Sequence, residues 1–565
     1  MSTRNLANVI VDSLANAGVS IVFGIPGAKV DGIFDALSDH PTIRLIICRH
    51  EQNAAFMAAA VGRLTGVPGV CLVTSGPGTS NLVTGLATAT SEGDPVIAIA
   101  GTVSRLQAAR HTHQALDVVK VLEGVCKSVT QVSVEDQVSE VVVNAFRRAR
   151  RYPQGASAVA LPMDLIKSTS VKTPPFPSLS FNPPTYGSSN PRLRNAALDK
   201  LLAAKSPVIL LGMRSANQAI VAATQRLIKD YTIPVVETFQ AAGAISEGLL
   251  HRFYGRVGLF RNQPGDKVLA RADVILAIGY DPFEYDAESW NVKPSCHNII
   301  HIDYTDAKVS QHYLPDIELI GNPADIIDEL NSSMHTARPS FWNGAEDALE
   351  SIRQELDSWE ATATVGMSLN EPVQPIQFVY LLRHLLPKET VVAVDVGTVY
   401  IYMMRYFRTY LPHHLLCSNG QQTLGVGLPW AIAASLSQKP VPCAEKVVSI
   451  SGDGGFMFSS QELATAVQQG CNITHFIWND SAYNMVEFQE EAKYGRSSGI
   501  RLGGVDFVKF AEAFDAKGFR VRTSGELESV MRAALAVKGV AIVEVVIDYS
   551  KSNELMRNVI PDDYK

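Results

Sequence analysis

Two short acidic motifs in the C-terminal third of the chain have the composition of a site for a divalent metal and a diphosphate. Gly452-Asp453-Gly454 follows the apolar run 446–451, and Asn479-Asp480 follows a second apolar run, 473–478, with 24 residues between the motifs. Mg²⁺ in proteins favours a few carboxylates together with substrate phosphates. Gly452, Gly454 and Gly455 would let backbone N–H groups approach a phosphate, to which a following helix also presents its positive end.

The elements around these motifs would place both aspartates at one edge of a sheet. Between the two apolar runs, residues 459–470 have the spacing of a helix, because apolar residues recur on one face and Gly470 can end it. A strand, helix, strand order of this length makes a right-handed parallel crossover, so Asp453 and Asp480 should reach the same carboxyl edge. We therefore expect them to share one Mg²⁺.

Two other interpretations of this segment stay open at this point. An ordinary strand-helix-strand unit can carry acidic residues in its turns without binding a ligand. A dinucleotide site is less compatible with the sequence, because the sixth position of a G-x-G-x-x-G match beginning at Gly452 is Met457.

A second candidate, Glu51, stands where a strand-like segment meets a helix-like one. Residues 44–48 are strand-like, and residues 51–66 are rich in alanine and end at Gly66, as a helix would. A junction of this kind can hold a carboxylate rigidly, although a lone Glu at a helix start is usually only a favourable partner of the helix dipole. The zinc motif H-E-x-x-H is excluded, because Ala54 stands where its second histidine would be.

Together the two motifs resemble the signature of thiamine diphosphate-dependent enzymes, which is Gly-Asp-Gly followed one crossover later by Asn-Asn or a close variant. Here the second Asn is Asp480, which keeps the oxygen ligand and adds a negative charge. The resemblance implies a Mg²⁺ held by Asp453, Asp480 and the backbone carbonyl of Ala482. It also implies a catalytic role for Glu51, because residues 49–58 match the family pattern Arg-His-Glu-x-x-Ala-x-x-Met-Ala. In that family this glutamate hydrogen-bonds N1′ of the aminopyrimidine and stabilises the imino tautomer that removes the C2 proton.

Within that family the chain resembles acetolactate synthases over nearly its whole length. The resemblance is carried by Phe23-Gly24-Ile25-Pro26-Gly27-Ala28-Lys29, by Thr74-Ser75-Gly76-Pro77-Gly78 and by Ser418-Asn419-Gly420-Gln421-Gln422-Thr423-Leu424-Gly425. It implies that Leu424 lies under the cofactor and forces the bent conformation that brings the imino nitrogen to C2; a plain core leucine is the alternative. The other cofactor-binding residues that it implies are Gly397, Thr398, Gln422, Gly452, Gly454, Gly455, Tyr483 and Met485.

The resemblance implies a reaction as well as a cofactor. Such enzymes condense two molecules of pyruvate to 2-acetolactate and CO₂ through a hydroxyethyl-enamine of thiamine diphosphate. Simple 2-oxoacid decarboxylases instead protonate that enamine, and three of their positions differ here, at Ala28, at 111–114 and at Val486. This favours carboligation, with a pocket lined by Lys29, Gln114, Met485 and Gln489. Another thiamine diphosphate-dependent 2-oxoacid decarboxylase or carboligase is the alternative, because His113 is still available to donate a proton.

FAD is not expected. Flavin-binding acetolactate synthases carry an arginine-rich segment after a strand of the middle domain, whereas the matching residues 278–285 contain no arginine. That segment and residues 254–263 look like those of catabolic, FAD-independent enzymes. In the family the two halves of the site meet across a subunit interface. The resemblance therefore also implies a homodimer or homotetramer with interfacial active sites, and pyruvate as the small-molecule substrate.

Length and composition predict several soluble domains. The chain has 565 residues, of which 46% are hydrophobic and 19% charged, and it lacks an apolar run of about 20 residues that would predict a membrane span. A net charge of −7 gives no electrostatic footprint for nucleic acid. Seven scattered cysteines without a C-x-x-C pair fit a reducing, cytoplasmic setting.

Apolar runs that alternate with helical stretches predict an α/β protein with three doubly wound parallel-sheet domains. They are expected at residues 1–168, 192–340 and 376–550, which the resemblance makes the pyrimidine-binding, central and diphosphate-binding domains. The proline-rich stretch 173–191 is typical of a linker. Buried strands are expected at 21–24, 43–48, 70–74, 96–100, 158–161, 208–211, 235–236, 274–278, 299–302, 391–394, 446–451 and 473–478.

Overall fold

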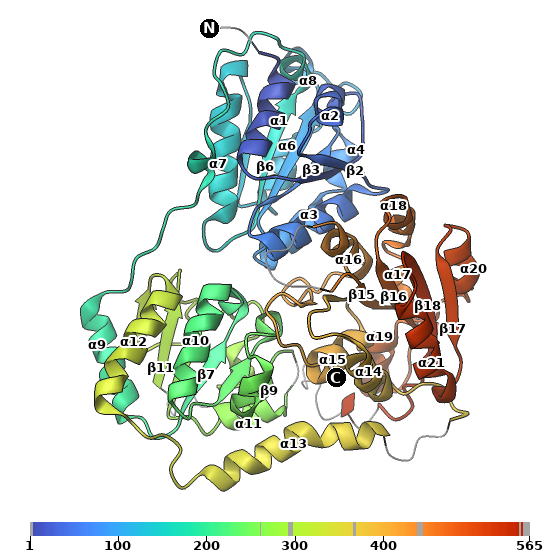
Figure 1. Ribbon diagram of the computed structural model, residues 1–565. Coiled ribbons are helices and arrows are strands. Elements are labelled where there is room, and N and C mark those ends of the chain that lie inside the picture. The colour runs from blue at the N-terminus through green and yellow to red at the C-terminus, as the bar shows by residue number, and fades with distance from the viewer. Residues whose placement is uncertain are drawn as a thin grey trace.

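Three sheets, each of six parallel strands, form the framework of the chain, and helices pack around them (Figure 1). The structure, a computed structural model, describes residues 4–259, 261–291, 298–364, 369–437, 444–552 and 555–556. In each sheet the first strand in chain order is an interior one. The next strands extend the sheet to one edge, and the later strands extend it to the other edge. This is the doubly wound α/β class that the sequence predicts.

The N-terminal sheet has the strand order β2-β1-β3-β4-β6-β5. Its strands are β1 (Ile21–Gly24), β2 (Arg44–Ile47), β3 (Gly69–Val73), β4 (Val96–Thr102), β5 (Ser128–Gln131) and β6 (Ala156–Pro162), and its helices are α1 (Leu6–Asn16), α2 (Asp31–Ser38), α3 (Glu51–Thr65), α4 (Pro77–Ser80), α5 (Val83–Ser91), α6 (Val118–Glu123), α7 (Val138–Arg150) and α8 (Met163–Ile166). The interior strands β3, β4 and β6 are buried at every residue, which explains their continuous apolar sequences. Helix α3 begins after His50, whose ring accepts a hydrogen bond from the Gln52 amide. It ends at Gly66, where φ is 71°.

The central sheet has the order β12-β11-β10-β7-β8-β9. Its strands are β7 (Pro207–Leu211), β8 (Val235–Glu237), β9 (Phe253–Arg256), β10 (Val274–Ile278), β11 (Asn298–Asp303) and β12 (Ile317–Ile320), and its helices are α9 (Pro191–Ala203), α10 (Gln218–Asp230), α11 (Pro264–Leu269) and α12 (Pro323–Ala337). Helix α13 (Glu346–Thr364) then runs below the central domain toward the C-terminal one, as Figure 1 shows.

The C-terminal sheet has the order β14-β13-β15-β16-β18-β17. Its strands are β13 (Val392–Val394), β14 (Leu415–Leu416), β15 (Val447–Gly452), β16 (Ile473–Asn479), β17 (Lys517–Val521) and β18 (Val540–Val546), and its helices are α14 (Pro375–Leu385), α15 (Thr398–Tyr406), α16 (Gly427–Leu436), α17 (Asp453–Phe456), α18 (Leu463–Gln468), α19 (Asn484–Tyr494), α20 (Phe507–Glu512) and α21 (Ser524–Leu535). Where one helix is expected over 459–470, the structure has a short 3-10 turn, Ser460–Glu462, followed by α18.

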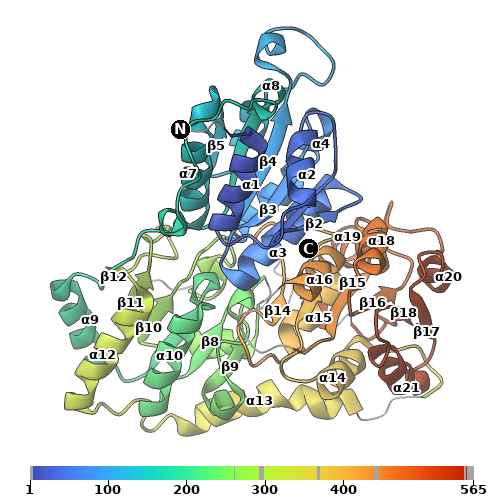
Figure 2. The ribbon, with the colours of Figure 1, turned by 45° about the horizontal axis from the view of Figure 1, so that its top comes forward.

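One apolar core joins the N-terminal and C-terminal sheets. Alternate residues of each sheet point into it, and the alanine-rich helices α3 and α16 pack against each other between them (Figure 2). Ala58 of α3 and Ala431 of α16 have no exposed surface. Because small side chains allow close approach, the two domains of one chain are held as a unit. No helix among the described residues is both long and apolar enough to cross a membrane.

Candidate cofactor and active site

A cavity of about 290 Å³ opens at the carboxyl edge of the C-terminal sheet. The neighbouring parallel strands β13, β15 and β16 end there, so the residues that follow each strand meet at one place. Every residue of the C-terminal domain predicted from the sequence lines this cavity: Gly397, Thr398, Gln422, Leu424, Gly452, Asp453, Gly454, Gly455, Asp480, Ala482, Tyr483, Met485 and Gln489. The parallel crossover thus brings Asp453 and Asp480 to the same edge, and the residues implied by the family resemblance line the same cavity.

Asp453 and Asp480 are the acidic pair of the cavity. Burial raises the pKa of Asp453 to about 6, and burial together with the negative charge of Asp453 raises the pKa of Asp480 to about 7. Two carboxylates that repel each other in a half-buried site favour a bound cation, and their hard oxygen atoms suit Mg²⁺. The loop after β16 is fixed at Ser481, whose amide donates to Oδ1 of Asn479 at 3.1 Å. The carbonyl of Ala482 is thereby presented on a rigid turn.

Glycines shape the part of the cavity that would receive a diphosphate. Gly397 precedes α15 with a φ of 126°, a conformation that side chains disfavour. A β-carbon on Gly454 would lie 2.6 Å from a ring carbon of Tyr483, so only glycine fits beneath that ring. Apart from its two chain neighbours, no described residue places an atom within 4 Å of the position of a β-carbon on Gly452. Backbone amides at these turns can therefore approach an anion closely.

Asp395, which the sequence argument does not identify, ties two loops of the cavity together. It follows β13 directly and is 1% exposed. Its carboxylate accepts hydrogen bonds from the amides of Val396 at 2.8 Å, Gly425 at 2.9 Å and Gly427 at 3.2 Å. Burial raises its pKa to about 6. The loop that carries Leu424 is thus held against the loop that carries Gly397, and the signal for Asp395 is its place at the carboxyl end of a predicted strand.

Glu92, also not identified from the sequence, holds the segment that leads to Gln422 and Leu424. It follows α5 of the N-terminal domain and is 3% exposed. It accepts hydrogen bonds from the Ser418 hydroxyl at 2.7 Å and from three successive backbone amides of the C-terminal domain, those of residues 419, 420 and 421. Successive amides that curl around one anion form a nest, a rigid arrangement. Gln240 of the central domain donates to the same carboxylate.

The catalytic candidates of the N-terminal domain lie apart from this cavity. Glu51, Lys29 and Gln114 are not among its lining residues. They cluster instead at the carboxyl edge of the N-terminal sheet. Glu51 accepts a hydrogen bond from Nδ2 of Asn81 at 2.9 Å, and Gln114 accepts one from the hydroxyl of Ser75 at 3.4 Å. The β-carbon of Lys29 lies beside Gly101, at the end of β4. Within one chain, Glu51, Lys29 and Gln114 therefore do not share a cavity with Asp453 and Asp480.

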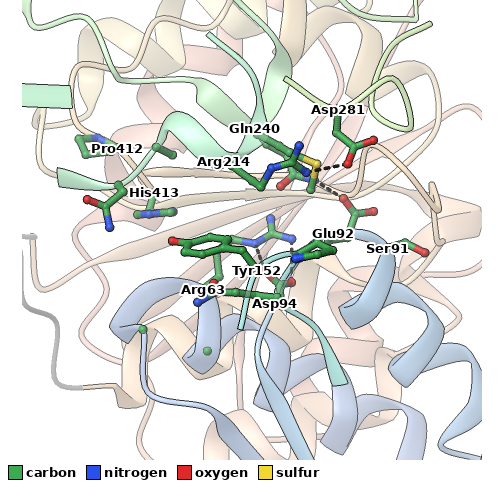
Figure 3. Close-up of a pocket in the computed structure, with 18 of the residues that line it drawn as sticks. Arg63, Ser91, Glu92, Asp94, Tyr152, Arg214, Gln240, Asp281, Pro412 and His413 are labelled. Carbon is green, nitrogen blue, oxygen red and sulfur yellow. Dashed lines mark hydrogen bonds and ion pairs between the residues drawn. The ribbon is translucent and has the colours of Figure 1, made fainter. Parts of the chain in front are cut away.

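A larger cavity of about 770 Å³ lies where the three domains meet (Figure 3). Several of its charged groups are paired within the chain. Arg63 forms two hydrogen bonds to Asp94, at 2.7 and 2.8 Å, and Arg214 lies 2.6 Å from Asp281. Glu92 is occupied by the amide nest. Because each of these charges already has a partner, they do not define the chemistry of a ligand.

Family models match all three domains. Residues 4–121 match the N-terminal TPP binding domain of thiamine pyrophosphate enzymes, residues 194–330 the central domain and residues 395–545 the C-terminal TPP binding domain. Thiamine pyrophosphate is another name for thiamine diphosphate. The chain is therefore a thiamine diphosphate enzyme, the class that its three sheets and its glycine-rich, acidic cavity indicate.

Individual relatives are more specific. The chain is 44% identical to an acetolactate synthase of Bacillus subtilis, over 99% of this chain and 96% of the relative. It is 42% identical to a catabolic acetolactate synthase of Raoultella terrigena, over 97% of this chain and 96% of the relative. It is 30% identical to the large subunit of acetolactate synthase isozyme 3 of Escherichia coli, over 96% and 95%. The chain belongs to the acetolactate synthase family, which confirms the resemblance found in its motifs.

Proposed function

We propose that this protein condenses two molecules of pyruvate to 2-acetolactate and CO₂ with thiamine diphosphate and Mg²⁺. The observation that carries the proposal is the cavity at the C-terminal sheet, which gathers every C-terminal-domain residue that the family signature implies. The full-length similarity to acetolactate synthases, including a catabolic one, supports the choice of reaction.

The acidic pair of the cavity is suited to hold the metal. Asp453, Asp480 and the carbonyl of Ala482 would bind Mg²⁺, and the glycine turns at residues 397 and 452–455 would bind the diphosphate. The raised pKa of each aspartate supports this, because a cation would remove the mutual repulsion that raises them.

We further propose that two chains complete each active site. The cavity of one chain contains no residue of its own N-terminal domain, whereas Glu51, Lys29 and Gln114 stand together at another sheet edge. A second copy could present its Glu51 edge to the first chain's cavity. A homodimer, or a homotetramer built from such dimers, would then contain two complete sites for every two chains.

Within the complete site each side chain would have a defined task. The cofactor, when bound, supplies an electron sink for decarboxylation of a 2-oxoacid. Glu51 would exchange a proton with the aminopyrimidine, and Leu424, which lines the cavity, would contact the cofactor. Gln489 and Met485 line the same cavity and would bound the space for the second pyruvate, together with Lys29 and Gln114 of the partner. Excluding water and acids from this space favours bond formation between two substrates over protonation.

We infer that the enzyme works without FAD. In a doubly wound sheet the phosphates of a nucleotide bind at the carboxyl edge where the strand order reverses, which here lies between β7 and β10. Arg214, after β7, lies 2.6 Å both from Asp281, after β10, and from Asp303, at the end of β11. Both carboxylates already pair with Arg214, so this guanidinium is not free to bind the diphosphate of a flavin nucleotide.

A cytoplasmic location is also proposed. The described cysteines are free thiols, and four of these five, Cys48, Cys71, Cys417 and Cys471, are buried. Free, buried thiols are typical of proteins that work in a reducing compartment.

Product analysis tests the proposed reaction. Flavin-stripped protein is incubated with pyruvate, thiamine diphosphate and Mg²⁺, and the products are identified. We expect 2-acetolactate. Acetaldehyde would instead indicate a 2-oxoacid decarboxylase, in which His113 or another group protonates the intermediate carbanion. Activity that appears only after FAD is added would overturn the flavin-independent assignment.

A further inference from the structure

Glu462 is a buried carboxylate of the C-terminal domain that bonds to the N-terminal domain. It ends the 3-10 turn after α17 and directly precedes α18. It has no exposed surface and does not line the cofactor cavity. The metal and cofactor chemistry proposed above therefore gives it no direct role, although a buried carboxylate is costly unless its oxygen atoms are satisfied.

Hydrogen bonds from the start of α3 satisfy this carboxylate. Its Oε1 atom accepts from the backbone amide of Arg49 at 2.8 Å, from that of His50 at 3.0 Å and from Nδ2 of Asn53 at 3.2 Å. Its Oε2 atom accepts from the hydroxyl of Thr465 at 2.6 Å. These four donors are uncharged groups, and the positive end of the α3 dipole favours the negative charge at this place.

These contacts fix the backbone immediately before Glu51. Glu51 is the first residue of α3, and the two amides that precede its own both donate to Glu462. The neighbouring guanidinium of Arg49 adds a second link to the same region, because it donates to Oε1 of Gln468 in α18 at 2.7 Å. The direction in which the Glu51 side chain leaves the helix is thus set from the C-terminal domain of its own chain.

We propose that Glu462 is a positioning residue for Glu51. The inference rests on the proposed function, in which Glu51 acts at the cofactor held by the partner chain. Glu462 follows Asp453 in the chain and so belongs to the domain that holds the metal of one active site. It nevertheless aligns Glu51, which the same chain donates to the other active site. A change at Glu462 should therefore impair the site to which its chain lends Glu51, and spare the site in which its chain holds the metal.

Hybrid assemblies can separate these two sites. One chain carries Asp453→Ala, which removes its metal site but leaves its Glu51, and the other carries Glu51→Gln with an intact cavity. The two chains are co-expressed with different tags, and assemblies that retain both tags are assayed with pyruvate, thiamine diphosphate and Mg²⁺. Each parent alone is inactive, so turnover in the hybrid comes only from the mixed site. An inactive hybrid would overturn the shared active site, and the inference with it.

Glu462→Ala is then introduced into either chain of the active hybrid. On the chain that donates Glu51, we expect kcat to fall by about 100-fold, the scale on which misplacing a catalytic group by about 1 Å lowers rates. On the chain that holds the cofactor, kcat should stay within about 2-fold, as for independent sites. Equal losses on both chains, or no loss on either, would overturn the inference.

Two further variants separate positioning from damage to the fold. Glu462→Gln keeps an oxygen acceptor for the three α3 donors, and its amide can donate to Thr465, so it should retain most of the turnover that alanine loses. Asp273→Ala is the matched control, because Asp273 also accepts from two successive amides, those of Lys205 and Ser206, in the central domain. Asp273→Ala should leave kcat of the hybrid unchanged, whichever chain carries it. Cofactor binding, followed by quenching of Trp478 in the cavity, should be unchanged in Glu462→Ala, and a loss of binding would contradict a role confined to Glu51.

Discussion

The carboxylate of Glu92 accepts a hydrogen bond from the hydroxyl of Ser418 at 2.7 Å, although the two residues lie in different domains of the chain. Three backbone amides beyond Ser418 turn toward the same carboxylate. The segment then continues to Leu424 in the cofactor cavity. An N-terminal-domain carboxylate thus shapes a C-terminal-domain loop, while Glu462 does the reverse for the loop before Glu51. Each of the two domains thus supplies one buried carboxylate that accepts hydrogen bonds from backbone amides of the other domain.

Replacing Glu92 with alanine should disturb cofactor binding more than the global fold. Several buried donors lose their acceptor, which costs about 2 to 4 kcal/mol of stability. Because the freed segment carries Gln422 and Leu424, the concentration of thiamine diphosphate needed for half-maximal activity should rise by about 10-fold or more. Steady-state assays at varied cofactor concentration measure this. Glu123→Ala, an exposed substitution in the same domain, is the control, and an unchanged cofactor requirement in a folded Glu92→Ala protein would contradict the role.

Replacing Glu51 with glutamine should abolish turnover and leave the metal–diphosphate site intact. Glutamine has nearly the same shape, but it cannot give up or accept the proton that the aminopyrimidine requires. Thiamine diphosphate with Mg²⁺ should still stabilise the protein against heat, because Glu51 does not line the cavity proposed to bind them. Calorimetry and exchange of the C2 proton of the cofactor into deuterium oxide measure the two effects. A normal rate of C2 proton exchange in this variant would contradict the catalytic role of Glu51.

Asp480→Asn should stabilise the protein in the absence of metal. The negative charge of Asp453 and burial both oppose ionisation of Asp480, so a neutral amide relieves a repulsion of about 1 kcal/mol. The amide oxygen can still bind Mg²⁺, and the stabilisation gained on adding Mg²⁺ and thiamine diphosphate should become smaller rather than vanish. Thermal unfolding with and without the ligands tests this. A lower melting temperature of the ligand-free variant would contradict the proposed repulsion.

Local patterns in the sequence bring the C-terminal candidate residues to one cavity, because these residues follow three apolar strands that end at one sheet edge. Most interior strands of the three sheets are found for the same reason. The strands not predicted are mainly those at the edges: β5, β9, β12, β14 and β17. An edge strand pairs on one side only and is short or half-exposed, as β5 is, so its apolar signal is weak. The interior strand β18 has a strong apolar run and the same rule would identify it.

The residues that hold the site in place are harder to predict. Glu92, Asp395 and Glu462 are single acidic residues whose importance comes from contacts that form only in the folded chain, such as that between Glu462 and the backbone amide of Arg49. A buried acid has no sequence signature that separates it from an exposed one. Likewise, no local pattern places Glu51 relative to Asp453, and only the folded chain shows that Glu51 does not line the cavity that contains Asp453.

The central domain should contribute a pH dependence of stability through Glu284. Burial raises the pKa of this carboxyl from 4.5 to about 7. The hydroxyl of Thr238 lies 2.5 Å from Oε2 of Glu284 and 3.2 Å from the carbonyl of Leu211. One hydroxyl hydrogen cannot serve both acceptors, so a protonated Glu284 can donate to Thr238 while Thr238 donates to Leu211. The folded chain therefore binds this proton more tightly than the unfolded chain does.

The sign of the effect follows from that difference. The stabilisation from Glu284 is fully present below pH 4.5, the pKa in the unfolded chain, and is lost as the pH rises through about 7. Glu284→Gln imitates the protonated form. Its free energy of unfolding relative to that of the parent should therefore rise between pH 5 and pH 8, by up to about 3 kcal/mol, and its relative melting temperature should rise with it. Glu350→Gln, an exposed change of the same charge, should show no such trend. If the difference in melting temperature between Glu284→Gln and the parent stays constant from pH 5 to pH 8, Glu284 is already ionised in the folded chain over this range.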